Sequence, residues 1–133
     1  MLYEYRLQTA REGFVDITGL VRDACRQSGV FDGMLTVYCP HTTAGVTINE
    51  NTDPAVLHDL LFALNQTYPD RKEFLHDEGN SAAHLKASVI GSSVTVMIDN
   101  GVPVLGRWQG IFFAEFDGPR TRRFTVKVMG SVR

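Results

Sequence analysis

The sequence predicts an α+β fold, a single compact domain of largely antiparallel or mixed sheets with two to three packed helices. Residues that alternate between apolar and polar mark strands near both ends of the chain, whereas helical spacing dominates its middle. The late strands are joined by short turns, which favours antiparallel pairing over a doubly wound parallel sheet. A chain of 133 residues suits one domain, so residues 1–133 are expected to form a single unit.

The first third of the chain is predicted to contain a strand, a helix and two further strands. Residues 3–7 alternate between apolar and polar, as in a half-buried strand. Apolar residues at helical spacing over 16–28 predict a helix, and Gly29 offers its C-terminal cap. Strands are expected over 34–39 and over 46–49.

Two helices are predicted in the middle of the chain. Four leucines between 57 and 64 form one apolar stripe, and Thr52 or Asp53 can cap this helix. A shorter helix over 82–90 follows residues 80–81, either of which is a suitable cap.

The last third of the chain is predicted to form antiparallel strands. Residues 94–98 and 124–128 alternate in the manner of half-covered strands. The nearly unbroken apolar run over 108–116 indicates a strand that is covered on both faces. So large a sheet in a short chain leaves an edge or a face to cover, and oligomerisation is one way to cover it.

Composition and charge exclude several classes of protein. The net charge of −2 gives no electrostatic case for nucleic acid or an anionic membrane as a partner. No apolar run approaches the roughly 20 residues needed to span a bilayer, and charges near the N-terminus argue against a signal peptide. A cytoplasmic location is therefore expected. Cys25 and Cys39 are too few for a disulfide framework and are expected to be reduced and buried.

Three of the four histidines lie in dense polar segments. His41 belongs to the segment over 39–45, whereas His76 and His84 bound the segment over 76–84. Neutral imidazole is both a common metal ligand and an acid–base group, so the three histidines suggest a site. His58 lies away from the leucine stripe of its helix and is expected to be a solvated flank instead.

Several further residues carry chemistry, and for each a purely structural role stays open. Glu115 interrupts the apolar run, so it either faces a site or pairs with a nearby arginine. The arginines at 120, 122 and 123, together with Lys86, form an anion subsite, or the arginines belong to a solvated turn or to salt bridges between subunits. Trp108 stands between two glycines and serves either as a wall for a flat ligand or as a core anchor.

Three motifs together resemble the YjbQ-like family, in order and over almost the whole chain. They are the run His41-Thr42-Thr43-Ala44-Gly45 through Asn51, the run His84-Leu85-Lys86-Ala87-Ser88, and the run Gly106-Arg107-Trp108-Gln109-Gly110 through Glu115 with Arg120. Thr43 replaces the serine typical of the family and keeps its hydroxyl. Arg107 stands where the family often has threonine and adds a charge beside Trp108.

The resemblance implies a homotrimer with a metal or anion site near the histidines. It also implies secondary thiamine-phosphate synthase activity, which joins a pyrimidine diphosphate to a thiazole phosphate and releases pyrophosphate. The resulting hypothesis is a metal-assisted enzyme that acts on a small phosphorylated molecule. The alternative is a non-catalytic, oligomeric module that binds a metabolite or a metal.

Each candidate residue has an expected role under the enzyme hypothesis. A divalent metal, zinc or magnesium, would be held by three imidazoles: His41, His76 and His84. Catalysis would involve three side chains: Glu115, His41 and Lys86. The substrate would be bound by a further group of polar and aromatic residues: Thr42, Thr43, Ser88, Trp108, Arg120 and Arg123.

Overall fold

Strand β7 (Gln109–Glu115) lies at the centre of the molecule, because both of its faces are covered. In the computed structural model, which describes residues 1–133, every β7 residue from Gly110 to Glu115 is buried. β7 pairs in antiparallel register with β2 (Gly13–Asp16) and with β4 (Ala44–Glu50), which forms a three-stranded sheet in the order β2-β7-β4. The expectation of a strand covered on both faces is confirmed.

A second, five-stranded sheet faces this one. Its order is β1-β8-β3-β5-β6, and all of its neighbouring strands are antiparallel. Its strands are β1 (Leu2–Gln8), β3 (Val30–Tyr38), β5 (Ser93–Asp99), β6 (Val102–Pro103) and β8 (Thr121–Val132). The first strand of the chain therefore pairs directly with the last strand, β8.

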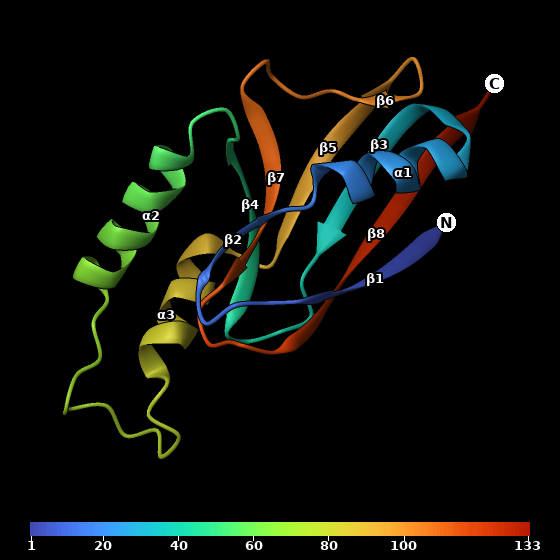
Figure 1. Cartoon of the computed structure of the whole chain (residues 1–133). Helices are drawn as coiled ribbons and strands as arrows, with labels where there is room; N and C mark the ends of the chain where they lie inside the picture. Colours follow the sequence, from blue (N-terminus) through green and yellow to red (C-terminus); the bar gives the residue numbers. More distant parts are fainter.

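Three helices complete the fold. They are α1 (Thr18–Ser28), α2 (Pro54–Thr67) and α3 (Ser81–Ile90). Figure 1 shows α2 and α3 on one side of the three-stranded sheet and the five-stranded sheet on its other side. The molecule is thus an α+β domain in three layers, as the sequence predicts. None of its helices is long and apolar enough to cross a membrane.

The two cores correspond to the two faces of β7. Ile111 and Phe113 join the main core of 17 buried residues between the sheets, to which α1 contributes Val21. Ala114, on the opposite face of the strand, belongs to a smaller core with Ala83 and other residues of the helical layer. Since side chains alternate along a strand, one apolar run supplies both cores.

The helix caps follow the sequence only in part. Gly29 has the left-handed φ of 71° expected at the end of α1, and Asp53 accepts a hydrogen bond from the Ala55 N–H at 2.9 Å. Asn80 is the N-cap residue of α3, but its side chain makes no capping hydrogen bond. The leucine stripe of α2 is only half-buried, because α2 has no fully buried residue.

Candidate functional site

The three predicted histidines line one polar cavity of about 430 Å³. His41 lies between β3 and β4, His76 lies in the loop before α3, and His84 lies in the first turn of α3. No Leu, Ile, Val, Met or Phe side chain lines this histidine cavity. Its lining residues are Pro40, His41, Thr42, Thr43, His76, Glu78, Asn80, His84, Asp117, Arg120 and Arg122.

His76 and His84 form a close pair, whereas His41 is engaged elsewhere. The ring centroids of His76 and His84 lie 5.4 Å apart, with an angle of 74° between the ring planes. No group of three or more His, Cys, Asp or Glu side chains is arranged to hold a metal ion. His76 and His84 therefore lie side by side, but the three histidines do not form the metal-binding set that the sequence suggested.

His41 is held by the backbone of β8. The Arg123 N–H donates to His41 Nε2 at 3.0 Å, and the Arg123 carbonyl oxygen lies 3.1 Å from the same nitrogen. Burial, and then the charge of Arg122, lower the pKa of the His41 imidazole below its ordinary value of 6.5. The ring is therefore neutral near pH 7, as both a metal ligand and a general base must be.

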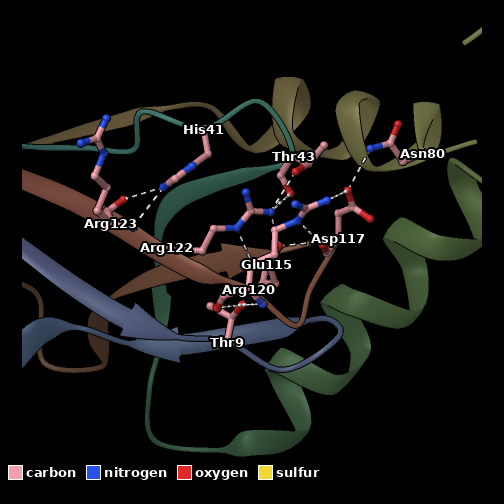
Figure 2. A network of polar contacts seen from close by, with 9 residues as sticks. All are labelled: Thr9, His41, Thr43, Asn80, Glu115, Asp117, Arg120, Arg122 and Arg123. Carbon is pink, nitrogen blue, oxygen red and sulfur yellow. Dashed lines mark hydrogen bonds and ion pairs between the residues drawn. The ribbon is translucent and has the colours of Figure 1, made fainter. Parts of the chain in front are cut away.

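Glu115 pairs with Arg122 behind the histidine cavity (Figure 2). Arg122 Nε donates to Glu115 Oε1 at 2.7 Å, and Nη2 donates to Oε2 at 2.5 Å. The Thr9 hydroxyl and the Asp117 N–H donate to the same carboxylate at 2.5 and 3.0 Å. Arg122 also donates to Thr43 Oγ1 at 2.8 Å. Of the two roles left open by the sequence, the structure shows ion pairing.

The environment of Glu115 keeps its carboxylate ionised. Burial by itself raises the pKa of Glu115, but hydrogen bonds from Arg122, Thr9 and the Asp117 N–H outweigh it, so the pKa lies below 4.5. Glu115 is only 1% exposed and does not line the histidine cavity. The geometry therefore gives Glu115 a positioning role through Arg122 and Thr43, in place of the predicted acid–base role.

A second polar cluster connects the wall of the cavity to α3 (Figure 2), and Arg120 is its only member that the sequence assigned to the site. Asn80 Nδ2 donates to Asp117 Oδ2 at 2.9 Å, and Arg120 donates to the same oxygen at 3.0 Å. Burial raises the pKa of Asp117, but these donors hold it below its ordinary value. Asn80 Oδ1 is buried and has no hydrogen-bond partner. The Arg120 guanidinium reaches the cavity already paired with an acid.

The other predicted residues are distributed over neighbouring cavities. Thr42 and Ser88 line an adjoining cavity of about 480 Å³ together with His41 and His84. Arg123 lines a smaller one of about 160 Å³ beside Arg6. These residues therefore surround the histidine cavity without all facing into it.

Lys86 and Trp108 lie outside the histidine cavity. Lys86 points into a separate cavity of about 440 Å³, which shares only Asn80 and Asp117 with the first. Trp108 precedes β7, whereas the ion-paired Glu115 ends it, and a strand of that length separates its ends by about 20 Å. Trp108 therefore lies away from the histidines of its own chain, and its stacking on a ligand stays a prediction. The residue is 52% exposed, and the Arg107 guanidinium lies over its ring.

The fold and the site together define a class of small α+β proteins in which a two-sheet core supports a polar cavity at one end. The chain belongs to the YjbQ-like (UPF0047) family, whose model matches residues 3–131. It is 53% identical over 131 residues to the UPF0047 protein MJ1081 of Methanocaldococcus jannaschii, covering 98% of this chain and 95% of that protein. It is 50% identical to the UPF0047 protein YugU of Bacillus subtilis, covering 92% and 93%.

Solved structures of family members have the same fold. A protein of the family from Clostridium acetobutylicum is 54% identical, with a TM-score of 0.93 over 96% of this chain and 99% of that one. A YbjQ-like protein of unknown function from Sulfolobus solfataricus is 30% identical, with a TM-score of 0.94 over 98% and 97%. The family and the fold expected from the three motifs are confirmed.

Proposed function

We propose that the protein is an enzyme that acts on a small phosphorylated molecule in the histidine cavity. The observation that carries this proposal is the gathering of three imidazoles from two distant segments into one cavity that no Leu, Ile, Val, Met or Phe side chain lines. Arg120 and Arg122 also line it. Their bonds to Asp117 and Glu115 use Nε and Nη2, which leaves Nη1 of each guanidinium for a phosphate oxygen. The hydroxyls of Thr42 and Thr43 add hydrogen-bond donors.

A divalent metal is part of this proposal, and of the two ions expected from the sequence zinc suits imidazole ligands, whereas magnesium prefers oxygen. His76 and His84 would hold it, since they form the close imidazole pair. When bound, the metal would polarise a phosphate oxygen of the substrate.

His41 would donate a hydrogen bond to the substrate in this site. Its Nε2 accepts from the Arg123 N–H, and burial and the charge of Arg122 lower the pKa of the ring, so the neutral ring carries its proton on Nδ1. This N–H would donate to a phosphate oxygen. Glu115 would act indirectly, because it fixes the guanidinium of Arg122 against Thr43.

Within this class, the specific reaction proposed is thiamine-phosphate synthesis from a pyrimidine diphosphate and a thiazole phosphate. Such a reaction needs two phosphorylated compounds side by side. Two cavities of about 430 and 440 Å³ with a common wall at Asn80 and Asp117 support this requirement.

The second candidate function is a non-catalytic module that binds a metabolite or a metal. The observation in its favour is that Glu115 and Asp117 both have lowered pKa values. Neither carboxyl is therefore protonated near neutral pH, where a general acid must hold its proton.

The decisive experiment compares the wild type with His84→Ala. We expect the wild type to retain stoichiometric metal and to turn over either a phosphate ester or the pyrimidine diphosphate with the thiazole phosphate. We expect His84→Ala to lose both properties. His58→Ala is the matched control, because His58 is exposed and pairs only with Asp59. Metal content and turnover that are unchanged in His84→Ala would refute the proposal. Binding of a phosphate ester or of the two thiamine precursors without any turnover would favour the non-catalytic module.

A further inference from the structure

The cavity between the helical layer and the turn after β7 contains a buried ammonium group without an acid partner. Lys86, on α3, is only 6% exposed, and it takes part in none of the ion pairs of the protein. Its Nζ donates to Asn65 Oδ1 at 2.5 Å and lies 5.7 Å from the ring centre of Phe116. A buried charge is unfavourable unless an opposite charge or several hydrogen bonds compensate it.

The protein supplies only part of that compensation. An ammonium has three N–H donors, and Asn65 accepts one of them. Asn65 is a neutral amide on α2, and its own Nδ2 donates to Glu12 at 3.2 Å. Two donors of Lys86 and its full positive charge therefore remain available where the side chain borders the cavity of about 440 Å³.

The N-terminus of α3 borders the same cavity and is also incompletely satisfied. The Asn80 side chain bonds to Asp117 and does not cap the helix. The backbone N–H groups of Ser81 and Ala82 accordingly make no hydrogen bond within the protein. Free N–H groups at a helix N-terminus carry partial positive charge and bind anions. Two independent features, Lys86 and this helix end, thus favour a negative group in one cavity.

The remaining charges of the cavity limit the kind of ligand. Asp117 is already paired with Arg120, so it leaves the charge of Lys86 uncompensated. Glu12 and Asp70 line the cavity as exposed residues, and Arg11 is exposed beside them. A ligand with an anionic group at Lys86 and amine or hydroxyl donors toward the exposed acids would match this arrangement.

We propose that this cavity is a second binding site, which takes the phosphate or carboxylate group of a small polar metabolite through Lys86 and the N-terminus of α3. The thiamine-phosphate proposal assigns a second phosphorylated compound to this same cavity, but the anion site inferred here does not depend on catalysis at the histidines. It assigns Lys86 to anion binding at a site of its own, whereas the sequence motifs grouped it with the histidines.

The test is calorimetric titration of the full chain with inorganic phosphate and, separately, with acetate. We expect one site per chain. The anion with the higher affinity identifies the group, phosphate or carboxylate, that the cavity prefers. Lys86→Met keeps an unbranched buried side chain that is one atom shorter and removes the charge. We expect affinity to fall by about 30-fold, which corresponds to ~2 kcal/mol for a charged pair. Lys72→Met, in an exposed position of the loop before α3, is the matched control.

Asn65→Asp tests the inference independently, because it places a carboxylate against Lys86. This internal counter-charge is expected to abolish anion binding while the protein stays folded with an unchanged or higher Tm. His84→Ala separates the two cavities: anion affinity should be unchanged in that variant, even where it loses metal. No binding of either anion to the wild type, equal affinity in Lys86→Met, or a loss confined to His84→Ala would each overturn the inference.

Discussion

Glu115 and Arg122 are the residues on which the wall of the histidine cavity depends. They are 1% and 5% exposed, and their hydrogen bonds connect β7, β8 and the segments that carry Thr9 and Thr43. A buried ion pair contributes little net stability compared with an apolar pair, but loss of one partner leaves the other charge uncompensated. The pair therefore fixes the geometry of the cavity wall, and a substitution of either partner alone should destabilise the protein strongly.

Glu115→Gln should lower the free energy of unfolding by about 3 kcal/mol or more, because Arg122 then stays buried without a counter-charge. Urea denaturation measures this change. Glu73→Gln is the control, since the pair of Glu73 with Arg71 is exposed and its loss should change stability by less than about 1 kcal/mol. Equal losses in both variants would contradict the role of the buried pair.

The lowered pKa values of Glu115 and Asp117 predict acid sensitivity. Both groups stay ionised in the folded protein at pH values where they are protonated in the unfolded chain. Their contribution to stability is therefore complete above the ordinary carboxyl pKa and is lost as the pH falls through the folded values. Urea midpoints measured from pH 7 to pH 3 should decline in the wild type and decline less steeply in Glu115→Gln. Equally steep declines in the wild type and in Glu115→Gln would argue against Glu115 as a source of the acid sensitivity.

At the residue scale, the inward direction of Arg122 is predictable from the sequence. Arg122 precedes Phe124, Val126 and Val128 at a spacing of two, so it shares their buried face, and the alternation alone predicts its inward direction. The pairing of Glu115 with a nearby arginine was an open alternative for another reason, namely that a buried carboxylate needs a counter-charge. The role of Asn80 was not predictable, because its partner Asp117 is distant in sequence and a cap is its usual use.

At the scale of elements, the site depends on how closely β4 approaches the end of α3. Gly45 lies on β4, and a Cβ atom added there would lie 2.5 Å from the Gly91 carbonyl oxygen. The Val46 N–H donates to that same carbonyl at 3.1 Å. The absence of a side chain at Gly45 therefore allows α3, with His84, to sit directly on β4.

Gly45→Ala should force these backbones apart and destabilise the protein by about 1–3 kcal/mol, the usual effect of overpacking. Thermal denaturation measures it. Gly19→Ala is the matched control, because Gly19 lies in α1 with no atom near its added Cβ, and alanine favours a helix by about 1 kcal/mol. A Gly45→Ala variant as stable as the wild type would show that the contact is not restrictive.

The predicted elements agree with the structure where the sequence pattern is long, whereas the shortest strands were not predicted. The three helices and the strands around 94–98 and 124–128 were predicted because burial imposes a clear period on them, and the strand around 108–116 was predicted from its nearly unbroken apolar run. β2 and β6 were missed, since four and two residues are too few to show alternation. Their positions are set by pairing with β7 and β5, which is a tertiary effect.

At the scale of the whole molecule, one face of the five-stranded sheet is left uncovered. Met34 pairs with Met97 on one side and with Met129 on the other, so three thioether side chains lie next to one another across β5, β3 and β8. They are 47%, 62% and 58% exposed. An apolar patch of this kind on a soluble domain commonly marks an interface.

The family resemblance implies a homotrimer, and we propose that this face is buried in it. Light scattering at micromolar concentration should give three times the mass of the chain. Met97→Glu should shift the mass toward the monomer by placing a charge in the interface, whereas Leu75→Glu, on a loop residue that is 94% exposed, should leave it unchanged. A wild-type monomer would refute the trimer, and a trimeric Met97→Glu would place the interface elsewhere.

The pairing of β1 with β8 has a consequence for how the chain is made. β1 is an edge strand whose only partner is β8, and Tyr3 lies opposite Val126. A ribosome releases β1 long before β8 exists, so the nascent chain carries an unpaired strand throughout most of its synthesis. Pairings between such distant segments also form slowly. Changes in β8, the last strand made and the partner of both β1 and β3, should therefore alter folding speed and exposure to aggregation during translation.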